Sequence, residues 1–309
     1  MSASVVPAEV SANATVVELR PRYEGANVGT WIGFKHLNYL VEEAVLEHLR
    51  RVGHSPTALY HEHGLCVDIA HIDTRIVRAL RVDDLAVAEV RPTGGMTYAV
   101  TIRRDAHDPR AVSSKVRVSL RLDTRGEAAE PVPADLLPYT VDRLGEGGEP
   151  IRIGDAEPAE ALRAGRNAFV WRHRIPYFYC HFAERLQMSG YLRIMEEVVD
   201  LFLADRGVSI KTLLDRQRLI PAVPHSRITL LDEAYMEEDL YTVFAVEQVF
   251  KRLTFTSRMD SYVLRDGVLV QTATGRITHG YAELAGRREW GLVDFDDVLL
   301  GALAGIGGH

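Results

Sequence analysis

The chain has 309 residues, enough for two domains of about 150 residues each, and its composition is ordinary for a globular protein. A net charge of −7 argues against a nucleic-acid backbone as the main partner, and two cysteines, Cys66 and Cys180, are too few for a disulfide framework or a four-thiolate zinc site. Residues 1–13 do not resemble a signal peptide, and no run approaches the roughly 18 apolar residues of a membrane helix, so we expect a soluble, cytoplasmic protein without a membrane partner.

The first half of the chain predicts one long helix followed by strands. An extended segment ends near Tyr23, and apolar residues then recur at intervals of three and four until Gly53, which is expected to end the helix. The recurring positions are Leu37, Leu40, Val41, Val45, Leu46 and Leu49. Alternating runs at 67–72 and 115–120 predict strands. We assign residues 14–124 to an N-terminal domain.

A histidine pair between the helix and the strands raises the question of a metal site. In His61-Glu62-His63, two histidines two positions apart share a face if the segment is a strand. No third ligand has a recognisable spacing. The sequence therefore predicts no metal.

The second half repeats the same order of elements after a connector. Residues 125–165 are rich in Ala, Pro, Glu and Gly and predict a surface linker. An extended segment then ends near Tyr177, helical spacing follows, and 241–246 predicts a strand. The apolar helix positions are Leu192, Met195, Val199, Phe202 and Leu203. Asp266-Gly267 predicts a tight hairpin turn. We assign 166–285 to a C-terminal domain and 286–309 to a tail.

The two halves align with each other at an offset of 154, as Tyr23 and Tyr177 illustrate. The alignment holds without a gap over about 55 residues, which indicates a duplication. We expect both tyrosines to pack at the strand ends. His71 and His225 fall on matching strands, where a histidine is more often a core residue than a functional one. One helix wrapped by an antiparallel sheet, present twice, is an α+β arrangement.

This layout resembles the hotdog fold, in which a sheet wraps one long helix. The segment from His181-Phe182 through Gly190 to Ile194 resembles the catalytic segment of β-hydroxyacyl-carrier-protein dehydratases. The same stretch with Glu196-Glu197, the hairpin at 265–270 and the run at 36–40 are similar to hydroxybenzoyl-CoA-type thioesterases. The resemblance implies a tandem (double) hotdog that acts on an acyl thioester carried on CoA or on the phosphopantetheine of an acyl carrier protein. It implies no other cofactor.

The sequence departs from both families at one catalytic position each. The thioesterases carry an aspartate where this chain has His181 in the second copy and Asn27 in the first. The dehydratases carry their acidic residue where this chain has Met195, one position before Glu196. One position along a helix turns a side chain by about 100°, so neither catalytic carboxylate transfers directly.

His181 is the predicted general base, because its ordinary pKa lies near neutrality. The acid is expected from the other copy, as Glu42 or Glu43, with Glu196 as the alternative in the same copy. Burial in an apolar tunnel would raise the pKa of such a carboxyl group. Ser189 is the predicted N-cap of the second helix, behind which Gly190 would let the thioester oxygen approach backbone amides. The predicted substrate-binding residues are Gly190, Ser189, Met188, Tyr191 and Asn27.

Three functions remain open on these residues. The first is dehydration of a β-hydroxyacyl thioester in fatty-acid or polyketide-type metabolism, which the histidine motif favours. The second is thioester hydrolysis, and the third is non-catalytic acyl binding. A carrier protein is the predicted protein partner, and a homodimer of the fused pair is left open.

Overall fold

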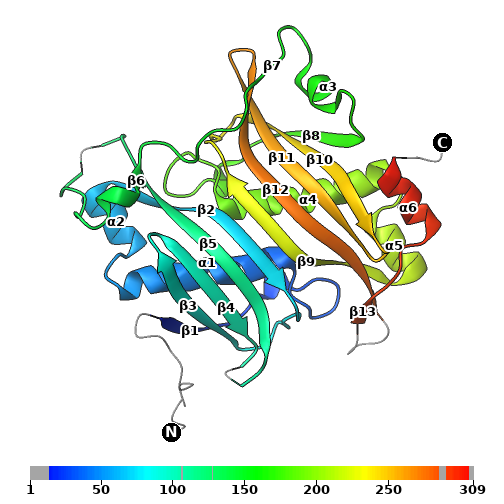
Figure 1. The fold of residues 1–309 in the computed structure, drawn as a ribbon, viewed down its shortest axis with the longest axis horizontal. Coiled ribbons are helices and arrows are strands. Elements are labelled where there is room, and N and C mark those ends of the chain that lie inside the picture. The colour runs from blue at the N-terminus through cyan, green and yellow to red at the C-terminus, as the bar shows by residue number, and fades with distance from the viewer. Residues whose placement is uncertain (1–13, 106, 127, 285–289, 306–309) are drawn as a thin grey trace. The chain divides into compact units, whose positions relative to one another are not determined.

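A computed structural model describes residues 14–105, 107–126, 128–284 and 290–305. The chain divides into two compact units, 1–142 and 143–309 (Figure 1). Residues 1–13, for which we expected no signal peptide, and parts of the predicted tail lie outside the described residues. None of the described helices is both long and apolar enough to cross a bilayer.

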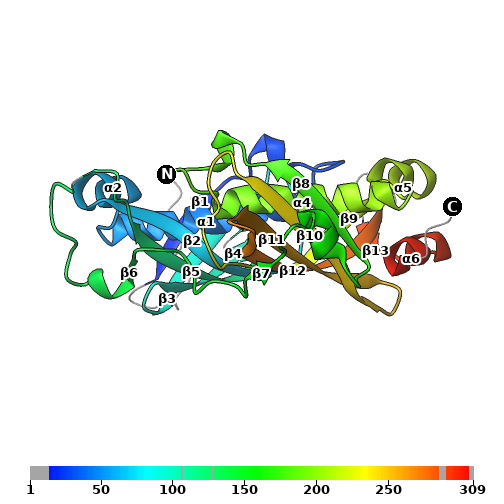
Figure 2. The ribbon, with the colours of Figure 1, turned by 90° about the horizontal axis from the view of Figure 1, so that it is seen from above.

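Unit 1 has five antiparallel strands with one long helix on them, and a short sixth strand that pairs parallel with the last of its long strands. The strand order is β1-β3-β4-β5-β2, and helix α1 contacts β1, β2, β3 and β4 (Figures 1 and 2). The elements are β1 (Thr15–Leu19), a 3-10 turn (Tyr23–Gly25), α1 (Phe34–Arg51), α2 (Pro56–His63), β2 (Leu65–Ile76), β3 (Ala86–Gly94), β4 (Thr97–Arg103), β5 (Arg110–Leu122), a second 3-10 turn (Leu137–Tyr139) and β6 (Thr140–Val141). The predicted helix and both predicted strands are confirmed.

Helix α2 corrects the expectation that His61 and His63 lie on a strand. Ser55 caps the start of α2 by accepting a hydrogen bond from the amide of Ala58 at 3.2 Å, and a proline occupies the first helical position. Gly64 ends the helix in the left-handed conformation, with φ at 64°. These two end signals select a helix although the intervening residues are mostly polar.

Unit 2 has the same plan. Its strand order is β9-β12-β11-β10-β8, and α4 lies along one face of this sheet (Figures 1 and 2). The elements are β7 (Ile151–Arg152), α3 (Pro158–Arg163), β8 (Ala168–Arg174), a 3-10 turn (Tyr177–Tyr179), α4 (Met188–Asp205), α5 (Ile210–Gln217), β9 (Leu219–Leu230), β10 (Asp239–Phe250), β11 (Thr254–Arg265), β12 (Val268–Leu284), β13 (Trp290–Leu292) and α6 (Asp297–Ala304). The hairpin turn is confirmed, because Asp266 and Gly267 both have positive φ between β11 and β12.

The structure repeats at the offset found in the sequence. Shifting the bounds of the first 3-10 turn, α1, α2 and β2 by 154 gives the bounds of the turn at 177–179, α4, α5 and β9. The isolated bridge between Trp31 and Arg81 becomes that between Arg185 and Tyr235 at the same offset. The structural repeat therefore extends beyond the residues over which the sequences of the two halves can be aligned.

The predicted linker contains more structure than its composition indicates. Leu162 of α3 is buried with Val170, Val243 and Tyr262 of the sheet, and Ile151 packs against the same cluster. β7 pairs with β12, and α3 contacts β8 and β10. Part of 125–165 thus packs on the unit 2 sheet through its few apolar residues.

The prediction that Tyr23 and Tyr177 pack at the strand ends is wrong. Their exposed fractions are 88% and 71%. Each is the first residue of a 3-10 turn that follows its strand. The residues two positions earlier, Pro21 and Ile175, are buried instead.

Candidate active site

His181 lies in the loop between the 3-10 turn at 177–179 and α4. The loop is closed by a bridge between Cys180 and Leu186, and the side-chain amide of Gln187 donates to the His181 carbonyl at 3.1 Å. The imidazole Nε2 lies 3.5 Å from the hydroxyl of Ser189. Partial burial, and then the positive charge of Arg193, lower the pKa of His181. The ring is therefore neutral at physiological pH and able to accept a proton.

Helix α4 begins two residues earlier than the prediction required. Gln187, with extended backbone, is the N-cap and makes no side-chain cap bond, so Ser189 is not the N-cap. Ser189 occupies the second helical position, which turns its hydroxyl toward His181. No described residue accepts a hydrogen bond from the amide of Met188, the first helical residue. This amide, at the positive end of the helix dipole, can donate to an anion.

Gly190 is required for packing. Its own amide donates to the Gln187 carbonyl at 2.9 Å, so it is not available to a substrate oxygen. A Cβ atom at this position would lie 2.5 Å from Leu186 Cδ1 and 3.0 Å from the carbonyl oxygen of Tyr179. The glycine lets the helix approach the loop that carries His181.

Gly190→Ala is expected to lower the stability of the chain by about 1–3 kcal/mol, because the added methyl group overpacks this contact. Gly126→Ala is the matched control, since a Cβ atom at Gly126 meets nothing within 4 Å. Chemical denaturation of the two variants measures the difference. Equal midpoints would contradict the packing role of Gly190.

Met188 and Tyr191, two of the predicted substrate-binding residues, have their side chains in the core of unit 2. Both side chains are buried. The Tyr191 hydroxyl donates to Thr272 Oγ1 at 2.9 Å, and burial raises the pKa of this phenol. Apolar spacing on a helix does not distinguish a substrate-facing position from a sheet-facing one.

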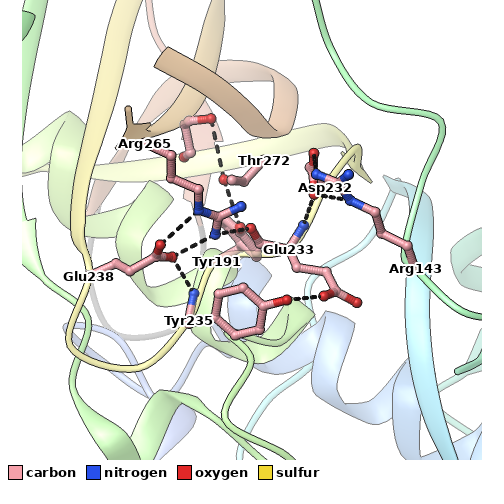
Figure 3. A network of polar contacts seen from close by, with 9 residues as sticks. Arg143, Tyr191, Asp232, Glu233, Tyr235, Glu238, Arg265 and Thr272 are labelled. Carbon is pink, nitrogen blue, oxygen red and sulfur yellow. Dashed lines mark hydrogen bonds and ion pairs between the residues drawn. The ribbon is translucent and has the colours of Figure 1, made fainter. Parts of the chain in front are cut away.

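A network of charged and polar residues holds the segment between β9 and β10 (Figure 3). Arg265 donates to both oxygens of Glu238 at 2.8 Å and to the Glu233 carbonyl at 2.9 Å. Arg143 donates to both oxygens of Asp232, and the Tyr235 hydroxyl donates to the Glu233 carboxylate. These contacts anchor residues along the whole segment 231–238.

The same segment binds the loop through its backbone. The amide of Leu186 donates to the Ala234 carbonyl at 2.8 Å, and that of Met236 donates to the Glu184 carbonyl at 2.7 Å. The buried guanidinium of Arg185 lies 3.7 Å from the Glu233 carboxylate. These residues were missed from the sequence, because pairs such as Arg143 and Asp232 have no characteristic spacing.

Arg265→Ala is expected to destabilise the chain by about 1–3 kcal/mol, because it leaves the half-buried Glu238 carboxylate and the Glu233 carbonyl without this donor. Arg172→Ala removes an ion pair whose two members are both exposed and should cost less than about 1 kcal/mol. Denaturation midpoints compare the variants. A larger loss for Arg172→Ala would refute this ranking.

The predicted carboxylates lie on the two long helices. Glu42 is half-buried on α1, and burial followed by the charge of Glu43 raises its pKa to about 8. No described residue forms a hydrogen bond or ion pair with the Glu42 side chain. Glu43 is exposed, and Glu196 is half-buried on α4 at the position equivalent to Glu42. The direction of the Glu42 shift is the one that the sequence analysis expected of a general acid, and its role stays a prediction.

The equivalents of the His181 loop residues in unit 1 are arranged differently. Asn27, at the position of His181, is exposed, and its amide nitrogen in the backbone donates to the Trp31 carbonyl at 2.8 Å. Asn38, one turn before Glu42, accepts a hydrogen bond from the Thr74 hydroxyl at 2.7 Å. That buried bond joins α1 to β2.

Comparisons with known proteins identify the fold. No protein-family model and no curated protein sequence matches the chain. A provisionally named oleoyl thioesterase from Lactobacillus plantarum is 14% identical, with a TM-score of 0.60 over 87% of this chain and 96% of that one. A 12:0-ACP thioesterase from Umbellularia californica is 11% identical, with a TM-score of 0.59 over 92% and 100%.

An acyl-ACP thioesterase from Bacteroides thetaiotaomicron is 11% identical, with a TM-score of 0.54 over 86% of this chain and 98% of that one. At these identities the likeness concerns the fold, and it extends over both units. The long helix on an antiparallel sheet in each unit agrees with this structural likeness. The chain has the hotdog fold.

Proposed function

We propose that the chain hydrolyses acyl thioesters. Three solved structures that match most of the chain carry the names of thioesterases, and two of these names specify an acyl carrier protein as the substrate carrier. The likeness supports hydrolysis ahead of dehydration, which the sequence motif placed first. The carrier is CoA or an acyl carrier protein.

The observation that carries the proposal is the position of His181 beside the start of α4, where its Nε2 lies 3.5 Å from the Ser189 hydroxyl. His181 takes a proton from water, and the resulting hydroxide attacks the thioester carbonyl carbon. The amide of Met188 can donate to the oxygen on which negative charge develops. When the intermediate collapses, the carbon–sulfur bond breaks and the thiolate recovers the proton from His181.

Glu42 is the second group that we propose takes part. Its pKa of about 8 keeps the carboxyl group protonated near neutral pH, as a proton donor requires. Ordinary surface glutamates are ionised under these conditions. We also propose that the two units are tandem hotdog domains, which the common offset of 154 in their turns, helices and strands supports.

Dehydration of a β-hydroxyacyl thioester remains the second candidate function. The run from His181-Phe182 to Gly190 favours it, and so does the protonated Glu42, because dehydration needs an acid for the departing hydroxide. His181 would then take the proton from the carbon next to the carbonyl.

One experiment separates the functions. The purified chain is incubated with a saturated acyl-CoA and with a β-hydroxyacyl-CoA, and the products are followed by mass and by free thiol. Release of acid and thiol supports hydrolysis, and loss of water with the thioester intact supports dehydration instead. If neither substrate changes while both bind, acyl binding without catalysis replaces the proposal. The same substrates on an acyl carrier protein test the carrier.

A further inference from the structure

The end of α2 and the segment after β5 bring a histidine and two carboxylates together in unit 1. One ring nitrogen of His63 and one carboxylate oxygen each of Glu62 and Glu130 lie within 4.8 Å of one another. The backbone amide of Glu130 donates to the Glu62 carbonyl at 2.8 Å. That bond fixes the later residue, which belongs to the predicted linker, against the end of the helix.

The imidazole of His63 is not committed to any hydrogen bond with a described residue. Its Nδ1 is buried without a partner, and its Nε2 lies 3.9 Å from the nearer oxygen of Glu62, too far for a hydrogen bond. The side chain is only 12% exposed. Nε2 is the ring nitrogen that faces Glu62, and because it donates to no described residue it can bind an ion held by the carboxylates.

The local charge also favours a cation. Neither Glu62 nor Glu130 forms an ion pair with a described lysine or arginine. Both lie at the C-terminal end of α2, where the helix dipole is negative. A bound divalent ion would neutralise the two carboxylates and complement the dipole.

We propose that Glu62, His63 and Glu130 bind a divalent transition-metal ion of the Zn²⁺ type. One imidazole and two carboxylates are suitable ligands for such an ion, whereas Mg²⁺ and Ca²⁺ prefer oxygen ligands alone. The ion joins α2 to the segment that follows β5. The sequence excluded a metal at His61-Glu62-His63 because its third ligand, Glu130, is distant in the chain.

The test is a calorimetric titration of the full-length, tag-free chain with Zn²⁺. We expect saturable binding that is roughly tenfold or more weaker in His63→Ala and in Glu130→Gln, a loss at least as large as that from removing a supporting residue of a metal site. His61→Ala is the matched control, since His61 is exposed on the same helix and outside the cluster. Its affinity should equal that of the wild type.

Glu130→Gln keeps the proposal testable if His63→Ala folds poorly, because it preserves the size of an exposed side chain. Excess Mg²⁺ should not displace Zn²⁺, and Zn²⁺ should raise the melting temperature of the wild type more than that of either variant. Absence of saturable binding would overturn the proposal. So would equal affinity in the wild type, His63→Ala and Glu130→Gln, which would assign the ion to other histidines.

Discussion

His181→Ala is expected to lower kcat for thioester turnover by about 10²-fold or more, the usual contribution of a positioned general base. The loss should appear mainly in kcat, because the variant removes a proton acceptor and leaves the remainder of the loop intact. The wild-type rate should fall as the solution becomes acidic, through a pKa below the ordinary value of 6.5, since protonation of His181 removes the base. Initial rates of thiol release from pH 5 to 8 measure both effects.

The matched control is His107→Ala, which removes an exposed histidine from unit 1. Its rate should equal that of the wild type. Substitution of Gln187 can be compared with His181→Ala. The Gln187 side chain donates a hydrogen bond to the His181 carbonyl at 3.1 Å but does not enter the reaction. Full activity in His181→Ala would place the site elsewhere, whichever reaction the chain performs.

Glu42→Gln is expected to make the chain more stable than the wild type at pH 8 and above. The pKa of Glu42 in the folded chain is about 8, against an ordinary value of 4.5, so the folded state binds the proton more tightly than the unfolded state does. The stability that this proton contributes is fully present below pH 4.5. It is lost as the pH rises through 8, and glutamine has no proton to lose.

The full shift in the Glu42 pKa corresponds to about 5 kcal/mol of unfolding free energy, at about 1.4 kcal/mol per pKa unit. Because Glu42 is only half-buried, we expect the stability difference between Glu42→Gln and the wild type to change by about 1–3 kcal/mol. Denaturation midpoints of both proteins at pH 5 and pH 9 give the difference. Glu43→Gln is the control: it removes only the smaller cause of the shift, so most of the pH dependence should remain. A constant gap between Glu42→Gln and the wild type at both pH values would disprove the raised pKa.

Activity gives a separate test of the same residue. If the protonated carboxyl donates a proton, the wild-type rate should decline above about pH 8, and Glu42→Gln should be slow at every pH. The corresponding substitution at the exposed Glu43 should change the rate little.

The repeated plan of the chain could be predicted from the sequence because it depends on local signals. Apolar residues three and four apart predicted the helix that ends before Gly53, and Asp266-Gly267 predicted the turn between β11 and β12. The alignment of the halves at 154 predicted the equivalence of α1 and α4. These signals act over a few residues, so they are visible without the rest of the fold.

Side-chain roles near the start of α4 were harder to predict. Ser189 has the right type for an N-cap, but the backbone of Gln187 takes that position. Tyr191 has an aromatic ring and a hydroxyl that suit a binding site, yet both are used in the core. The orientation of a helix relative to its sheet decides such cases, and composition does not report it.

The sequence by itself determined the duplicated helix-and-sheet plan, the position of His181 before the second helix, and the candidate carboxylates on the first. The tertiary structure decided which of these groups titrate abnormally and which are only structural. It showed the burial that raises the pKa of Glu42 and the carbonyl of Tyr179 that requires Gly190. It also brought Arg143 to Asp232 and Glu130 to His63. Desolvation and ion pairing depend on which distant residues meet in space, so these features follow only from the folded chain.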